Sequence, residues 1–172
     1  MKIAIDIGHN CPPDTGALGV KSEDEMNRLV GEFLIKLLIS AGVDVIDCRP
    51  KSATTVGLSL WKRTNSANTC GADFYVSLHH NAGGGLGSEV FAVSDEGIAA
   101  AKRVLSKLVG LGFRDRGVKR QGFYVIKNTL MPAILVEVCF VDSNADCTLW
   151  DKLGCKAIAQ AIFEGLQESL KF

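Results

Sequence analysis

The residues of this chain best suited to chemistry are His9, Glu23, His79 and Glu137. Two imidazoles and one carboxylate are a common ligand set for catalytic zinc, and they leave a fourth coordination position open. A second carboxylate that does not bind the metal can then act as a general base. These residue types therefore predict a hydrolase with one zinc ion.

The three histidines of the chain all follow short apolar runs that are typical of strands. His79 and His80 end the same run, and neighbouring strand residues point to opposite faces of a sheet. One of the two rings must therefore lie on the side of Ser77 and the other on the side of Leu78. A single histidine after a strand is more often structural, but two of them beside a glycine-rich loop favour a metal site. The pattern alone does not choose between them.

Three consecutive carboxylates, Glu23, Asp24 and Glu25, lie where a helix is expected to begin. Ser22 can cap this helix, and the positive end of the helix dipole favours negative charge there. Capping by itself would explain the cluster. The residues therefore leave open which carboxylate, if any, has a role in the site.

Glu137 interrupts the apolar run AILVEVCFV, which is apolar enough to be buried on both faces. A buried carboxylate costs several kcal/mol unless it is paired, hydrogen-bonded or protonated. One explanation is a salt bridge to Arg63 or Lys127. The other, which we favour, is a general base whose pKa is raised by desolvation.

Apolar runs alternate with helical patterns from end to end, which is typical of a single α/β domain with a mostly parallel, twisted sheet of about six strands flanked by helices. Sites in such open sheets form beyond the carboxyl ends of the strands, so His9, His79 and Glu137 are expected at one edge. Strands are expected over residues 2–7, 43–48, 73–79, 89–93, 123–127 and 133–141, and helices over residues 25–41, 59–69, 95–111 and 151–170.

The composition excludes several classes of function. Lysine plus arginine and aspartate plus glutamate number 19 each, so no basic excess indicates a nucleic acid or a membrane surface as partner. No apolar run approaches the length of a membrane-spanning helix. The opening MKIAIDIGHN is typical of a strand rather than a signal peptide, which predicts synthesis in the cytoplasm. The six cysteines are scattered and form no CxxC pair, so reduced thiols are expected.

Several motifs occur in a recognisable order along nearly the whole chain: IDIGHN, DTGALG, EDEMN, LWKRTNSAN, ADFYVSLHHNA and RGVKRQGFYVIKNTLMPAILVEVCFVDSN. In this order they resemble the zinc-dependent N-acetylmuramoyl-L-alanine amidases of bacterial autolysins, sporulation lysins and phage endolysins. The chain departs from the common family pattern at three positions. It has Ile7 in place of proline, His80 in place of a small residue and Cys139 in place of glycine.

The resemblance implies that residues 1–172 are a zinc amidase catalytic domain. It implies one zinc ion per chain, with His9, Glu23 and His79 as ligands, and Glu137 as the catalytic glutamate. Glu23 is selected by its spacing to Asn27, and His79 by its place after the Ser-Leu pair of the motif.

Other residues have weaker indications. Asn81 and His80 are candidate substrate contacts, although a turn role would equally explain Asn81. Asp14 is a candidate partner for a histidine ligand, although capping of its loop is the simpler explanation. Arg63 is expected to form a structural ion pair.

The implied reaction is hydrolysis of the amide between the lactyl group of N-acetylmuramic acid and L-alanine in peptidoglycan. Peptidoglycan would be the partner of the enzyme, which is expected to be a monomer. The chain would either act on the cell wall after its release from the cell or form the catalytic part of a longer protein. Two alternatives remain: a carboxypeptidase-like zinc peptidase on a similar scaffold, and a catalytically silent peptidoglycan-binding module.

Overall fold

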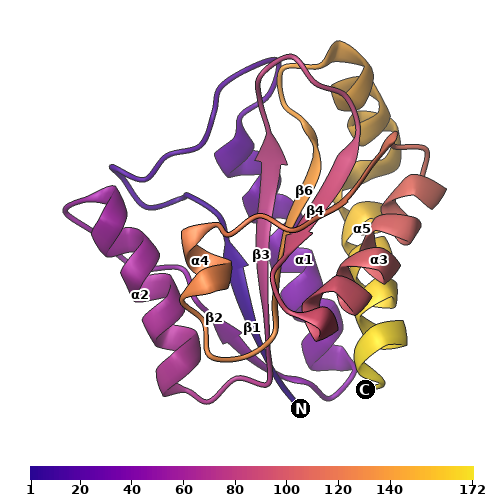
Figure 1. Cartoon of the computed structure of the whole chain (residues 1–172). Helices are drawn as coiled ribbons and strands as arrows, with labels where there is room; N and C mark the ends of the chain where they lie inside the picture. The colour runs from indigo at the N-terminus through magenta and orange to yellow at the C-terminus, as the bar shows by residue number, and fades with distance from the viewer.

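The computed structural model describes every residue from Met1 to Phe172, and a six-stranded sheet forms its centre, in the order β2-β1-β3-β6-β4-β5 (Figure 1). The neighbouring pairs among β2, β1, β3 and β6 are parallel, whereas β4 is antiparallel to β6 and parallel to β5. This confirms the predicted α/β fold with a mostly parallel sheet. The strands are β1 (Lys2–Ile7), β2 (Asp44–Asp47), β3 (Phe74–Asn81), β4 (Ser88–Ala92), β5 (Asp115–Lys119) and β6 (Ala133–Phe140).

Helices cover both faces of the sheet, as Figure 1 shows. On one face α1 (Glu23–Ser40), α3 (Asp95–Gly110) and α5 (Asn144–Leu170) enclose a core of 30 buried residues. On the other face α2 (Val56–Thr69) and the single-turn helix α4 (Tyr124–Lys127) enclose a core of only 10. The second face is thus the thinner layer, and it is the one with room for a cleft.

The alternation of side chains along β3 decides which histidine faces this thinner layer. Val76 and Leu78 belong to the larger core, and Tyr75 belongs to the smaller one. By the period of two along a strand, His79 points to the face of α2 and α4, and His80 points to the face of α1 and α5. The expectation that the two rings point to opposite faces is confirmed.

The segment 123–127 was expected to be a strand, and this prediction was wrong. Tyr124–Lys127 is one turn of helix, in which the adjacent residues Val125 and Ile126 are both buried against the sheet. Short apolar runs do not distinguish a strand from a buried helical turn by periodicity. The sixth strand is instead β5, Asp115–Lys119, whose sequence DRGVK contains a single apolar residue. This polar sequence is compatible with a strand because β5 is an edge strand that pairs only with β4.

The helices α2 and α5 begin three and seven residues before their expected starts, because capping side chains rather than apolar residues begin these helices. Thr55 accepts a hydrogen bond from the backbone N–H of Leu58, so α2 begins at Val56 rather than residue 59. Ser143 caps α5 in the same way, and α5 therefore begins at Asn144 rather than residue 151. Non-helical backbone at Gly154, with φ of 75°, kinks this helix.

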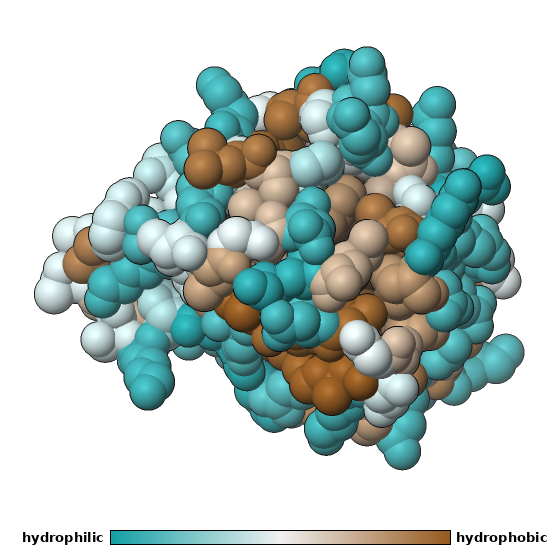
Figure 2. All heavy atoms as spheres, turned by 90° about the horizontal axis from the view of Figure 1, so that it is seen from below, coloured by the Kyte–Doolittle hydropathy of each residue, from teal (hydrophilic) through white to brown (hydrophobic).

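The two chain termini lie together at the end of the sheet where β1 begins (Figure 1). Seen from that end, charged and polar side chains surround smaller apolar groups (Figure 2). None of the helices combines the length and the apolar character needed to cross a bilayer.

A candidate metal centre in an open cleft

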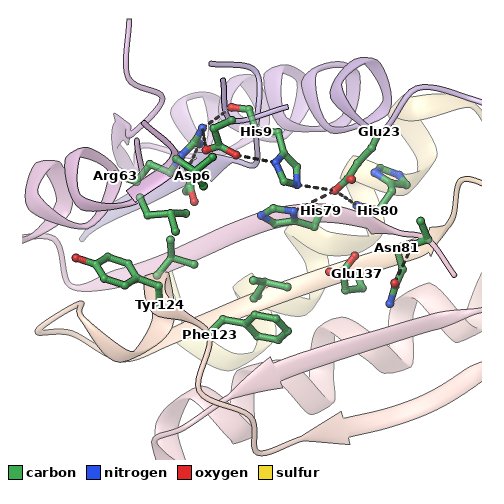
Figure 3. Close-up of a pocket in the computed structure, with 16 residues that line it drawn as sticks. Asp6, His9, Glu23, Arg63, His79, His80, Asn81, Phe123, Tyr124 and Glu137 are labelled. Carbon is green, nitrogen blue, oxygen red and sulfur yellow. Dashed lines mark hydrogen bonds and ion pairs between the residues drawn. The ribbon is translucent and has the colours of Figure 1, made fainter. Parts of the chain in front are cut away.

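A cavity of about 340 Å³ opens between the sheet, α2 and α4, beyond the carboxyl ends of β1, β3 and β6 (Figure 3). Its floor carries the polar residues, and Val56, Leu60, Phe123 and Tyr124 supply an apolar wall. Phe123 packs edge-on against Phe91, with ring centroids 4.9 Å apart, which anchors this wall to the sheet. The residues expected at one sheet edge therefore share one cavity.

His9, Glu23 and His79 form a cluster whose potential ligand atoms all lie within 4.8 Å of one another. Glu23 Oε1 lies 3.3 Å from His9 Nε2 and 3.1 Å from His79 Nδ1. The two imidazoles meet edge to face, with centroids 4.8 Å apart. Figure 3 shows both rings and the carboxylate converging on one point above the sheet.

The three carboxylates at the start of α1 have different surroundings. Glu23 is 5% exposed and faces the imidazoles. Asp24 Oδ1 accepts hydrogen bonds from the backbone N–H groups of Asn10 and Gly16, and so fastens the preceding loop to the helix. Glu25 is exposed, and its backbone N–H is capped by Ser22. Among the three, only Glu23 is placed to bind a metal.

Two glycines leave the space that these side chains occupy. A Cβ atom at Gly8 would lie 2.3 Å from His79 Cε1, and one at Gly16 would lie 2.9 Å from Glu23 Oε2. Glu23 Oε2 also accepts a hydrogen bond of 2.9 Å from the N–H of Ala17. The loop after β1 therefore both makes room for the cluster and holds one of its members.

Behind His9 lies a buried network of charges. His9 Nδ1 donates to Asp14 Oδ1 over 2.8 Å, and Asp14 Oδ2 accepts from Ser59 and from Arg63. The Arg63 guanidinium, 1% exposed, also donates to Asp6 Oδ1 at 2.6 Å and to the carbonyl oxygen of His9. Asp14 is thus a partner of a histidine, and Arg63 is in the predicted structural ion pair, with Asp6 and Asp14.

We expect an Arg63→Leu protein to lose about 3–5 kcal/mol of its free energy of unfolding, because two buried carboxylates would lose their cation. Urea denaturation of the metal-free protein at neutral pH measures this. Arg28→Leu is the matched control, since Arg28 makes an exposed i,i+4 pair with Glu32 on α1, worth about 0.3–0.5 kcal/mol. Equal losses in the two variants would contradict a stabilising role for the buried network.

The electrostatics of the cluster favour a cation. Burial lowers the pKa of His9, but hydrogen bonds to Asp14 and Glu23 outweigh this and raise it to about 10. Burial raises the pKa of Glu23, but the hydrogen bonds from His79 and His9 outweigh it and lower the value below its usual range. Without a metal, a proton on His9 supplies the positive charge that the carboxylates of Asp14 and Glu23 attract.

Glu137 lies beside this cluster on β6, directly across from His79 on β3 and from Glu89 on β4. Its Oε2 atom is buried and has no hydrogen-bond partner, and neither Arg63 nor Lys127 forms the salt bridge considered from the sequence. Burial raises the pKa of Glu137 to about 7, although nearby His79 lowers it. The carboxyl group can therefore exchange a proton near neutral pH, and Figure 3 shows it in the same cleft.

The two candidate substrate contacts are placed differently. Asn81 lines the cavity, where its Nδ2 donates to Glu89 Oε1 at 2.7 Å and its Oδ1 accepts from the N–H of Ala82. The side chain of His80 is 2% exposed and donates from Nδ1 to Asn27 Oδ1 on α1. His80 is among the residues that line the cavity, but its ring lies on the other face of the sheet from His79 and packs toward α1.

Two polar residues of this site, Asp6 and Glu89, were not predicted from the sequence. Asp6 interrupts the apolar run of β1 as Glu137 interrupts that of β6, so the same reasoning could have singled it out. Glu89, 3% exposed, binds Asn81, Arg116 and Lys119. Nothing in the local sequence indicated these contacts, because their partners lie on other strands.

Comparison with known proteins identifies relatives along the whole chain. The protein CwlM of Bacillus licheniformis, an N-acetylmuramoyl-L-alanine amidase, is 35% identical over 172 residues, covering 96% of this chain and 65% of that protein. The sporulation-specific N-acetylmuramoyl-L-alanine amidase of Bacillus subtilis is 30% identical over 175 residues, covering 99% and 67%. An uncharacterized protein of Clostridium perfringens is 35% identical over 98% of this chain and 52% of its own length. The chain spans about half to two thirds of these relatives.

Solved structures share the fold. The catalytic domain of the CD27L endolysin, which targets Clostridia difficile, superposes with a TM-score of 0.89 at 33% identity, covering 98% of this chain and 97% of that one. The catalytic domain of CwlV, an amidase from Bacillus (Paenibacillus) polymyxa var. colistinus, gives a TM-score of 0.86 at 28% identity, covering 99% and 98%. The family profile described as N-acetylmuramoyl-L-alanine amidase matches residues 3–168. The resemblance inferred from the motifs is confirmed, and the chain belongs to the N-acetylmuramoyl-L-alanine amidase family.

Proposed function

We propose that this chain is a zinc-dependent amidase that hydrolyses the bond between N-acetylmuramic acid and L-alanine in peptidoglycan. The observation that carries the proposal is the meeting of His9, Glu23 and His79 with an unpaired, buried Glu137 in one open cavity. A member of this family with such a cavity has both a candidate metal site and a candidate base.

The three clustered side chains fit one zinc ion per chain. Two imidazoles and a carboxylate are a ligand set of catalytic zinc sites, which keep one position open. Asp14 holds His9 Nδ1, so that Nε2 is left to face the cluster, and such carboxylate–histidine pairs orient metal ligands. A bound zinc ion would supply Lewis acidity, polarising the scissile carbonyl and lowering the pKa of water.

Glu137 would perform the proton transfers. Its carboxylate takes a proton from the attacking water and returns it to the leaving amino group of L-alanine. A pKa of about 7 suits both steps, because the group can accept and release a proton near neutral pH. The Oε2 atom has no protein partner to compete for that proton.

The remaining walls of the cavity would bind the substrate. Leu60 and Phe123 shield one side of the metal site from water, and the exposed side chains of Val56 and Tyr124 lie at its rim. Asn81, fixed by Glu89, is the polar side chain that we assign to substrate contact, and the buried ring of His80 is given no such contact. We further propose that the protein acts as a monomer on the cell wall.

The test is an assay of zinc-loaded protein on purified peptidoglycan. New amino termini on L-alanine, with glycan strands freed of peptide, are the expected products, identified by mass spectrometry of the soluble fragments. Cleavage only within the stem peptide would instead favour a carboxypeptidase-like peptidase. Binding to the wall without any cleavage would favour a silent binding module.

A further inference from the structure

His80 is the histidine that the metal cluster does not include, and it is fully enclosed. Its ring, 2% exposed, packs edge-on toward Trp150 of α5, with centroids 6.5 Å apart. Its Nδ1 atom lies 2.7 Å from Oδ1 of Asn27, a residue of α1 with no exposed surface.

The contacts of Asn27 determine how its amide group is oriented. Its Nδ2 atom lies 3.3 Å from the carbonyl oxygen of Gly8 and 3.4 Å from Oε1 of Glu23. Both of these atoms only accept hydrogen bonds, so the amide nitrogen must face them. The amide oxygen is then left for His80, and because an amide oxygen only accepts, Nδ1 of His80 must carry a proton and donate it.

One carboxylate oxygen of Glu23 contacts both the imidazoles of the metal cluster and the groups beside His80. Oε1 faces His9 and His79 at 3.3 and 3.1 Å, and it accepts from Asn27 and from the backbone N–H of His80. We propose that His80 is a positioning residue of the metal centre, which acts through Asn27 to hold Glu23 in the orientation that binds the metal. This inference rests on the proposed zinc site.

The chemistry of the ring supports this role. His80 Nε2 is buried without a hydrogen-bond partner, as is the neighbouring Trp150 Nε1. An apolar side chain of similar size would fill the same space without leaving a buried ring nitrogen unpaired. The property that distinguishes histidine at this position is its Nδ1–H donor, and the sole partner of that donor is Asn27.

The test compares two substitutions that differ in this donor. His80→Leu fills the space and has no donor, whereas His80→Asn carries an amide nitrogen close to the position of Nδ1. Zinc dissociation constants are measured by competition with a chromophoric chelator, and melting of the metal-free proteins monitors folding. We expect His80→Leu to bind zinc about 10- to 100-fold more weakly, as for losses of other residues that orient metal ligands. His80→Asn should recover most of the affinity.

Val76→Ala is the matched control, because Val76 is buried on the same face of the same strand and belongs to the larger core. It should lower the melting temperature and leave the zinc affinity unchanged. In an Asn27→Ala background, His80→Leu should have little further effect on zinc affinity, because the side chain through which His80 acts on Glu23 is already absent.

The outcomes separate the two proposals. Wild-type affinity in His80→Leu, or fully additive losses in the double variant, would overturn the role of His80 while leaving the metal centre intact. A wild-type protein that binds no zinc would overturn the metal centre itself.

Discussion

A Glu137→Gln protein is expected to lose amidase activity by about 10²- to 10⁴-fold in kcat, the usual contribution of a general acid–base group. Glutamine keeps the shape of the side chain but cannot take a proton from water. The metal ligands are untouched, so zinc should still bind stoichiometrically. Steady-state kinetics on peptidoglycan fragments, together with metal analysis of the same samples, measures both quantities.

Glu25→Gln is the control for this substitution, because Glu25 is an exposed carboxylate outside the cleft. It should leave kcat unchanged. A Glu137→Gln protein that degrades cell walls as fast as wild type would remove Glu137 from its assigned role as base.

The same substitution should affect stability in a pH-dependent way. Burial raises the pKa of Glu137 from 4.5 to about 7, so the folded metal-free protein binds this proton more tightly than the unfolded chain does. The resulting stabilisation is complete below about pH 4.5 and is lost as the pH rises through about 7. At about pH 8 the metal-free Glu137→Gln protein should therefore be more stable than wild type, by up to about 3 kcal/mol.

This difference should disappear at about pH 4, where the carboxyl group is protonated in both states. Thermal unfolding in the presence of a chelator, recorded across this pH range, is the measurement. A difference between the two proteins that does not change with pH would mean that the ionisation of Glu137 is not the cause.

Removal of one imidazole is the second large effect that we expect. Structural zinc sites bind with about 10–16 kcal/mol, so one ligand of four is worth roughly 3–4 kcal/mol, or about 100- to 1,000-fold in affinity. The zinc affinity of a His79→Ala protein should fall by this factor, and its amidase activity should fall with the bound zinc. Chelator competition measures the affinity, and activity is assayed at stoichiometric zinc.

Ser77→Ala is the matched variant for His79, since Ser77 lies on the same face of the same strand and bonds only to Asp6. It should keep the metal. Comparison with a His80→Ala protein is also informative, because the loss should be larger for His79, which faces the cluster. Loss of zinc from the His80 variant alone would reverse the assignment of the ligand.

Much of the fold could be predicted because its signals are local. Alternating apolar runs and helical stripes placed β1, β2, β3, β4 and β6 and the helices α1 and α3 close to their observed positions, and they placed the end of α5 but not its start. The predictions failed where the apolar run is short, or where a strand forms only because a distant segment pairs with it. Tyr124–Lys127 form a helical turn because they pack over β3 and β6 inside the sheet, away from its edges. The strand β5 forms from the polar sequence DRGVK because β4 offers it a partner.

The sequence by itself determined that His9 and His79 come near the carboxyl ends of strands and that Glu137 interrupts a buried one. Residue spacing and apolar periodicity are properties of a continuous segment, so they can be read without the tertiary structure. The motif order determined the family in the same way. The motif order had singled out Glu23, but only the tertiary structure placed it against the imidazoles and turned His80 toward Asn27. It also brought Arg63 to Asp6 and Asp14, 57 and 49 residues away in the chain. These contacts depend on the sheet order and on the docking of α1 and α2, which fix side chains from distant segments at hydrogen-bonding distance.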